Sequence, residues 1–253
     1  MIPLKLSVII ITKNEAANIR DCLASVAFAD EVVVVDSGST DDTVAIARAL
    51  GAQVFEFKDW PGFGAQKNRA LHFASHDWVF SLDADERVTP ALQAELLSAM
   101  QGEFDGYFVP RLSQFCGTFI HHCGWYPDYV LRLFKKSHAR FSDDVVHEHV
   151  ELQGRSARLR NDLLHYTYLN MSDVARKTLQ YAHAGAEKSF ARGKRATALD
   201  APVRGSWAFM RTYVLRAGFL DGTAGYQIAR MNAQTTYLKY RQLQSLCCLA
   251  KPR

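Results

Sequence analysis

Four short apolar runs, separated by segments with helical character, constrain the fold of this chain more than any other feature. The runs are rich in β-branched residues and lie at 6–11, 31–35, 53–57 and 78–82. Continuous apolar runs of this length are typical of strands buried on both faces of a parallel sheet. We expect helices at 15–29, 40–50 and 68–73 between them, and a fourth from Pro90 to about residue 100. This order predicts an α/β fold with right-handed crossovers.

The rest of the chain has two further patterns. Residues 106–165 contain short strand-like runs separated by loops, and the chain reads as helices from about residue 172 to its end. We therefore expect a domain over 1–170, divided into a ligand-binding part (1–105) and a second part (106–170), and a helical region over 171–253. Within the first part, we expect Ser39 to cap the helix at 40–50 and Gly51 to end it.

Composition excludes several classes of protein. The chain has 253 residues, 48% of them hydrophobic and 22% charged, with a net charge of +4, which is ordinary for a globular protein and gives no reason to expect nucleic acid. The five cysteines include no CxxC pair, so we expect reduced thiols rather than a zinc site. We find no signal peptide and no apolar run long enough to span a membrane, so any membrane contact is expected to be peripheral.

Polar residues follow three of the predicted strands at their carboxyl ends. These are Thr12 to Glu15, Asp36 to Ser39, and the pair Asp83 and Asp85. Ligands of open α/β sheets bind beyond this edge, so we expect one shared site. Two close carboxylates repel each other, and a divalent cation such as Mg²⁺ relieves this when phosphate oxygens are also present. The alternative for each segment alone is a solvated turn or a helix start.

Two common nucleotide-binding patterns are missing. No GxGxxG follows the first strand and no GxxxxGK[ST] occurs, which disfavours dinucleotide-binding and P-loop enzymes. The segments VIIITKNE (8–15), VVVDSGSTD (33–41) and SLDADE (81–86), in this order, instead resemble the family 2 glycosyltransferases, which have the GT-A fold. The resemblance implies inverting, metal-dependent transfer of a hexose from a nucleoside diphosphate sugar, usually a UDP-sugar.

The same resemblance implies roles for individual residues. Asp85 would bind the metal, Mg²⁺ or Mn²⁺, and Asp83 would contact the ribose or the metal. The residues implied in donor binding are Thr12, Asn14, Glu15, Asp36, Ser37, Lys67, Asp83 and Ala84. Late histidines often complete the metal site of GT-A enzymes, and His165, after an apolar pair, is the candidate here.

The second half of the chain resembles a narrower group. The segments RLF (132–134), DDVVHEHV (143–150), LLHY (163–166) and GFLDG (218–222) are similar to lipopolysaccharide inner-core glucosyltransferases of the WaaE and LgtF type. This resemblance implies UDP-glucose as donor and a core heptose as acceptor. A transferase for another cell-surface polysaccharide or a protein glycan, a non-catalytic sugar-nucleotide-binding protein and a nucleotidyltransferase remain as alternatives.

Inversion requires a carboxylate that takes the proton of the acceptor hydroxyl. We expect Glu148 to be this base, with Asp143 and Asp144 as competitors and a surface position as the alternative. Around it, the residues expected near the acceptor are His147, His149, Asp144 and Arg132.

Basic and aromatic residues are interleaved in the last third of the chain, for example around Trp207 and Arg211. This composition favours contact with an anionic membrane surface, although a packing helix with solvated charges is the alternative. A lipid-linked, phosphorylated glycan acceptor would agree with this, and we expect a cytoplasmic protein that is peripheral on the inner face of the bacterial inner membrane.

Overall fold

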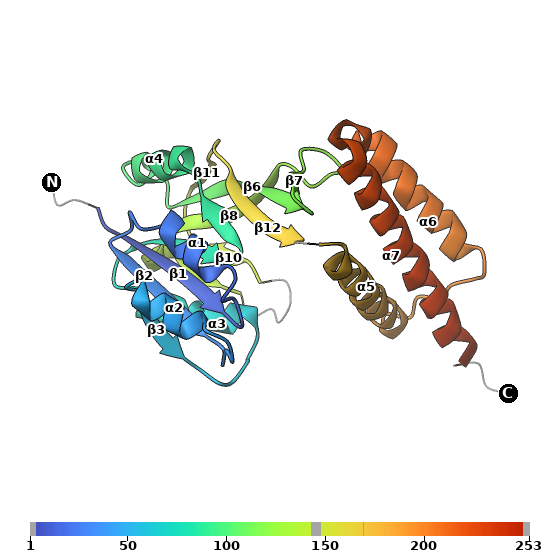
Figure 1. Ribbon diagram of the computed structural model, residues 1–253, viewed down its shortest axis with the longest axis horizontal. Helices are drawn as coiled ribbons and strands as arrows, with labels where there is room; N and C mark the ends of the chain where they lie inside the picture. Colours follow the sequence, from blue (N-terminus) through green and yellow to red (C-terminus); the bar gives the residue numbers. More distant parts are fainter. Residues whose placement is uncertain (1–3, 143–147, 169, 250–253) are drawn as a thin grey trace. The chain divides into compact units, whose positions relative to one another are not determined.

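The computed structural model describes residues 4–142, 148–168 and 170–249 (Figure 1). The chain forms two compact units. The first comprises residues 1–111 and 128–165, and the second comprises residues 112–127 and 166–253. The second unit is therefore discontinuous in sequence, because residues 112–127 belong with the C-terminal helices.

The first unit contains most of the strands. Its helices are α1 (Ile19–Ser25), α2 (Thr43–Ala49), α3 (Phe63–Phe73) and α4 (Pro90–Ala99), with a 3₁₀ turn η1 (Lys136–His138). Its strands are β1 (Leu6–Thr12), β2 (Glu31–Asp36), β3 (Gln53–Glu56), β4 (Trp78–Asp83), β5 (Glu86–Val88), β8 (Asp128–Lys135), β9 (Ala139–Phe141), β10 (Val150–Leu152) and β11 (Ser156–Arg158). Two more strands, β6 (Gly106–Phe115) and β12 (Leu163–Tyr168), continue into the second unit.

The main sheet has the strand order β3-β2-β1-β4-β8-β6-β12-β5. The four predicted strands β1 to β4 are parallel to one another, which confirms the βαβ interpretation of the first hundred residues. Strand β8 pairs antiparallel with both β4 and β6, and β12 pairs antiparallel with β5. The predicted α/β fold is thus confirmed, and the complete sheet is mixed because β8 runs antiparallel to both its neighbours and β12 runs antiparallel to β5.

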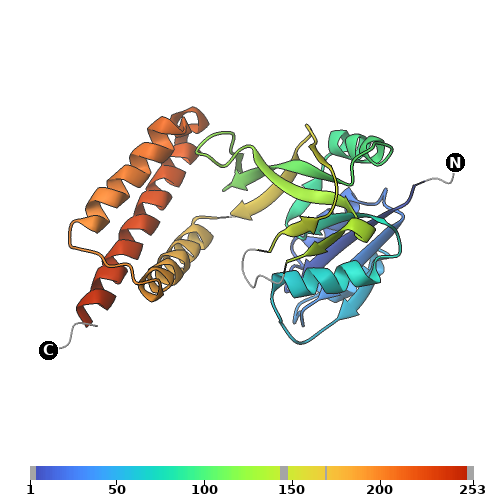
Figure 2. The same ribbon diagram turned by 180° about the vertical axis from the view of Figure 1, so that it is seen from behind.

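Strand β1 is buried on both faces, as its continuous apolar run predicted. Val8 and Ile10 belong to a core cluster with Ile19 and other residues of α1. Ile9, which points to the opposite face, belongs to a second cluster with Ala70 and other residues of α3. Figure 2 shows α3, in cyan, in front of the parallel strands.

The prediction that Ser39 caps the second helix is wrong. Helix α2 begins at Thr43, and its N-cap residue Asp42 makes no side-chain capping bond. The Ser39 hydroxyl instead donates to Asp36 and accepts a hydrogen bond from the backbone N–H of Asn14, 2.8 Å away. A short hydroxyl side chain that bonds nearby groups in this way stabilises a turn and delays the helix.

The second unit is helical, as predicted for the end of the chain. Its elements are β7 (Thr118–Phe119), α5 (Met171–Ala191), α6 (Asp200–Met210), the π-helical turn η2 (Arg211–Leu215), the 3₁₀ turn η3 (Gly218–Asp221) and α7 (Gly222–Leu249). Small residues such as Ala186, Ala208 and Ala229 are buried where these helices pack. None of the helices in the described ranges is long and apolar enough to cross a membrane.

Candidate functional site

A cavity of about 500 Å³ opens at the carboxyl ends of β1 and β4, within the first unit. Its lining comprises Ile11, Thr12, Lys13, Glu15, Trp60, Phe63, Lys67, Asp83, Ala84, Asp85, Glu148 and His165. Eight of the predicted site residues therefore meet in one place, although they come from segments far apart in sequence. Parallel strands end at the same edge of a sheet, which is why the sequence could predict much of this convergence.

Three predicted donor-binding residues, Asn14, Asp36 and Ser37, lie outside this lining. Buried Asp36 accepts hydrogen bonds from the Thr12 hydroxyl (3.0 Å) and from the backbone N–H of Gly38 (2.9 Å) and Ser39 (2.8 Å). Asn14 accepts from the N–H of Thr40 at 2.8 Å. Asn14 and Asp36 thus join the segments that follow β1 and β2, whereas the Ser37 hydroxyl accepts a hydrogen bond from the Gln66 side chain of α3 at 2.8 Å.

Asp83 lies between two cations. One carboxylate oxygen is 3.0 Å from Nζ of Lys67, which α3 presents, and the other accepts from the Arg132 guanidinium of β8 at 2.7 Å. Burial alone would raise the pKa of Asp83, but the charges of Arg132 and Lys67 hold that pKa well below its ordinary value. Asp83 is therefore an ionised carboxylate whose charge is already balanced by protein groups.

Arg132 is buried beneath the cavity and joins two carboxylates. It also donates to Glu86, a fully buried residue whose second oxygen accepts from the backbone N–H of Asp83 at 2.9 Å. Burial raises the pKa of Glu86, although Arg132 opposes this effect, and the two carboxylates keep the pKa of Arg132 above its ordinary value despite burial. Nε of Arg132 has no hydrogen-bond partner among the described residues. The arrangement fixes Asp83 at the base of the cavity.

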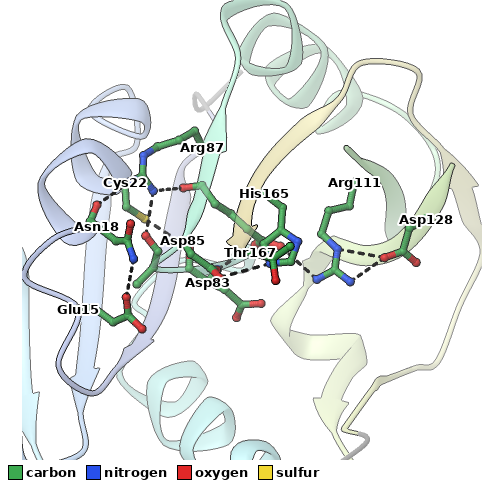
Figure 3. Close-up of polar contacts among 12 residues, drawn as sticks. Glu15, Asn18, Cys22, Asp83, Asp85, Arg87, Arg111, Asp128, His165 and Thr167 are labelled. Carbon is green, nitrogen blue, oxygen red and sulfur yellow. Dashed lines mark hydrogen bonds and ion pairs between the residues drawn. The ribbon is translucent and has the colours of Figure 1, made fainter. Parts of the chain in front are cut away.

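Asp85 and His165 form a close pair in the lining of the cavity (Figure 3). His165 Nε2 on β12 lies 3.3 Å from the Asp85 carboxylate. Burial raises the pKa of Glu15, and the negative charge of nearby Asp85 raises it further. A carboxylate and an imidazole beside space for phosphate oxygens fit the ligands of Mn²⁺ or Mg²⁺. Within the described ranges, however, no group of three or more His, Cys, Asp or Glu side chains is placed to hold a metal.

Glu148 stands where this cavity adjoins a second one. Its carboxylate lies 3.1 Å from Nζ of Lys67, and Lys67, Asp83 and Glu148 line both cavities. The second cavity, of about 460 Å³, is also lined by Arg132 and His149, two residues predicted to lie near the acceptor. Asp143, Asp144 and His147 lie outside the described residues.

Two arginines of the site were not predicted from the sequence. Arg87 donates to the carbonyl oxygens of Ala84 (2.9 Å) and Asn18 (2.8 Å), so it joins the turn at 83–86 to the start of α1 (Figure 3). Arg111 pairs with Asp128 at 2.6 Å and approaches Glu86 at 3.6 Å. For Arg87, the only indication in the sequence was its position directly after the acidic motif at 83–86. The partners of Arg111 are set by strand pairing.

The sequence of this chain is similar to those of known glycosyltransferases. Residues 7–152 match the family model described as glycosyl transferase family 2. A lipopolysaccharide core biosynthesis glycosyltransferase, LpsC of Rhizobium meliloti, is 31% identical over 95% of this chain and 95% of its own length. An uncharacterized glycosyltransferase of Rickettsia prowazekii is 31% identical over 96% of this chain and 87% of its own.

A solved structure, S. aureus TarS 1-349, is similar over 94% of this chain and 92% of that chain, with a TM-score of 0.50 and 18% sequence identity. At that identity the likeness concerns the fold. Together with the match to the family model, it confirms the GT-A fold that the sequence motifs implied, with a mixed central sheet and C-terminal helices.

Proposed function

This chain belongs to glycosyl transferase family 2, and from that premise we propose that it transfers glucose, with inversion, from UDP-glucose to a heptose of the lipopolysaccharide core. The observation that carries the proposal is the position of Glu148. It lines a cavity that contains Asp83, Asp85 and His165, and it also lines the neighbouring cavity. A base at such a junction can reach an acceptor hydroxyl on one side and a donor sugar on the other.

The first cavity is the proposed donor site. Its lining contains the ion pair of Asp83 with Lys67. It also contains Asp85 and His165, which contact each other. Asp85 and His165 would hold a divalent cation, which would neutralise charge on the departing diphosphate when bound. Lys67, which is nearly buried, supplies a fixed positive charge next to the same group.

Glu148 is the proposed general base. Inversion in one displacement requires that the acceptor oxygen attacks the anomeric carbon while its proton passes to a carboxylate. The contact with Nζ of Lys67, 3.1 Å away, holds the Glu148 carboxylate in one position at the junction of the two cavities. Asp83 shares this lysine, so the base and the donor site are positioned by one side chain.

The second cavity is the proposed acceptor site. Arg111 and Arg132 line it, together with Tyr129 and Phe108, so it offers both positive charge and ring surfaces. Such a lining suits a sugar that carries phosphate groups. The similarity to a lipopolysaccharide core transferase supports a core heptose as acceptor, and a lipid-linked acceptor would place the protein at the cytoplasmic face of the inner membrane.

A UDP-release assay tests the proposal. The purified chain would be given a panel of UDP-sugars and a heptose-terminated core acceptor, with Mg²⁺, with Mn²⁺ and with chelator. We expect the fastest release from UDP-glucose, dependence on both cation and acceptor, and an inverted linkage in the product by NMR. Turnover only with another acceptor would replace the core assignment by another cell-surface polysaccharide or a protein glycan.

Two variants test the assigned residues. Glu148→Gln removes the base and should lower kcat about 10²–10⁴-fold while the donor still binds. Asp85→Asn should instead raise the cation concentration needed for half-maximal activity about 10–100-fold. The matched control is Glu151→Gln, which changes an exposed carboxylate of β10 that pairs with Arg140 at 2.7 Å. If both site variants kept the activity of the control, the assignment of Glu148 as base and of Asp85 as metal ligand would fail.

A further inference from the structure

Helix α6 and the turn η2 carry a row of apolar side chains that the described residues of the second unit leave largely exposed. Leu199, Val203, Trp207, Met210 and Val214 follow one another at intervals of three or four residues, so they share one face of the helix. Their exposed fractions lie between 45% and 72%. Single exposed apolar residues are common, but a continuous row of this length on a helix points to a binding surface.

The opposite face of the same helix does the packing. Ala201, Gly205, Ala208 and Thr212 are buried, and α6 makes extensive contacts with α7. A Cβ at Gly205 would lie 3.3 Å from the backbone oxygen of Ala233, so the two helices are already in close contact there. The exposed row therefore plays no part in holding this unit together.

The exposed surface continues beyond the helix. Leu215, Phe219 and Leu220 are between 50% and 65% exposed and follow Val214 through the turns η2 and η3. We call the surface formed by these three residues and the row on α6 the apolar face. It includes one tryptophan and one phenylalanine, which favour the boundary between water and lipid because they combine a large ring with limited flexibility.

Positive charge accompanies the apolar face. Arg204 and Arg211 directly follow Val203 and Met210 and are both exposed, and Arg216 follows Leu215. Over residues 199–220 the chain has these three arginines and one acidic residue, Asp200. Over the helical stretch 171–249 it has twelve lysines and arginines against four acidic residues, although the net charge of the whole chain is only +4. The helical stretch thus carries the excess of positive charge. Arg211 and Arg216 place part of it beside the apolar face, while Arg204 is paired with Asp200 at 2.9 Å.

We propose that the apolar face docks on the surface of an anionic lipid bilayer, with α6 lying in the plane of the interface. Its alternation of exposed apolar side chains and arginines is typical of helices that insert one face into the boundary between headgroups and acyl chains. Since no described helix is suited to crossing a membrane, the contact is interfacial.

A second copy of the chain fits the apolar face less well. In a two-fold symmetric dimer the same surface meets itself, so Arg211 and Arg216 would approach their own counterparts. Like charges at such a contact oppose association, whereas acidic lipid headgroups complement them. Docking of the apolar face would hold the protein at the membrane, as the proposed function requires. It depends on neither the donor nor the acceptor assignment.

Sedimentation with lipid vesicles tests the docking. The full chain would be mixed with vesicles of phosphatidylcholine alone and with vesicles containing phosphatidylglycerol. We expect binding that requires the anionic lipid and weakens with added salt. The variant Val203→Ser/Trp207→Ser/Met210→Ser should bind at least tenfold more weakly, and Arg204→Gln/Arg211→Gln should bind about tenfold more weakly to anionic vesicles only.

Matched controls lie on α5, where Leu179 and Arg176 are also exposed. Leu179→Ser and Arg176→Gln should leave vesicle binding unchanged. Circular dichroism and UDP release with a water-soluble acceptor should be unchanged in every variant, which separates loss of docking from loss of fold or of the proposed activity. Equal binding by the triple variant and the wild type would overturn the proposal. So would a wild-type dimer in solution that the triple variant converts to a monomer, because that result would assign the face to a second copy.

Discussion

The two units of this protein differ in the side chains that they bury: the first buries charged groups, and the second leaves large apolar groups exposed. Around the proposed donor cavity of the first unit, charged side chains are paired and largely buried, as in the group formed by Arg132, Asp83 and Glu86. In the second unit, small residues fill the helix contacts while Trp207, Leu199 and their neighbours remain exposed. In the first unit, buried ion pairs hold charged side chains in fixed positions. In the second unit, the helices pack through close backbone contact, and large apolar side chains stay exposed.

The difference shows where each unit can be damaged. A buried ion pair is weak evidence of net stability, but removal of one partner leaves an uncompensated charge. A contact between helices made by glycine and alanine has no such charge at risk, and it fails when a side chain is added rather than removed. We therefore expect the first unit to be sensitive to the loss of a charged partner and the second unit to be sensitive to added side-chain volume.

The largest effect on stability is expected from Arg132→Ala. The substitution leaves the carboxylates of Asp83 and Glu86 without their main cation, so the free energy of unfolding should fall by about 3–5 kcal/mol in urea titrations followed by circular dichroism. Arg140→Ala, which breaks an exposed pair with Glu151, should cost no more than about 1 kcal/mol. Similar losses in the two variants would contradict the view that the buried charges depend on one another.

Gly225→Ala tests the second unit. A Cβ at this position would collide with the backbone oxygen of Gly218, which cannot move without shifting the turn η3, so we expect a loss of about 2–3 kcal/mol. Limited proteolysis should then show faster cleavage within residues 171–249. In Gly185→Ala the new Cβ meets only the flexible side chain of Lys239, and the gain in helix propensity should leave stability equal or higher by about 1 kcal/mol. An equal loss of unfolding free energy in both variants would show that the contact between Gly225 and Gly218 is not the cause of the destabilisation.

Acid should weaken the first unit through Asp83. Because the pKa of Asp83 is lowered in the folded state, its ionised form contributes stability above its unfolded pKa of about 3.9, and this contribution is lost as the pH falls through the folded pKa. The difference in the free energy of unfolding between the wild type and Asp83→Asn should therefore be constant near pH 7 and shrink below about pH 4. Urea titrations between pH 7 and pH 3 measure this, and a difference that did not change with pH would show that the two cations do not stabilise the ionised form.

The smallest effect is expected from Ser39→Ala. The substitution removes one bond to Asp36 and the partner of the Asn14 N–H, which should cost about 1 kcal/mol. Because these bonds hold the loops beside the donor cavity, KM for the UDP-sugar should rise while kcat is kept. Ser98→Ala, at an exposed position of α4, serves as the control and should change neither constant. A fall in kcat without a change in KM would place Ser39 closer to the chemistry than we propose.

Much of the donor cavity could be predicted because its residues follow strands directly. The carboxyl ends of β1 and β4 bring Thr12, Glu15 and Asp83 together, and a register that pairs Thr12 with Asp36 explains the hydrogen bond between them. Arg132 lies 49 residues from Asp83 in the chain, and no local pattern indicated that it would be buried against two carboxylates. The role expected for it near the acceptor remains a proposal, and the structure adds its contact with the donor-side carboxylate.

The sequence by itself determined the four parallel strands, the helices between them and the family, because strand and helix periods and the three acidic motifs are local properties of the chain. Only the tertiary structure decided which charges are paired. The antiparallel placement of β8 beside β4 puts Arg132 under Asp83, and α3 brings Lys67 to both Asp83 and Glu148. The apolar face was decided in the same way, since an apolar residue at helical spacing becomes a core residue or an exposed one according to which face meets a neighbouring helix. Pairing and burial depend on the meeting of segments far apart in sequence, and that is a property of the fold rather than of any single segment.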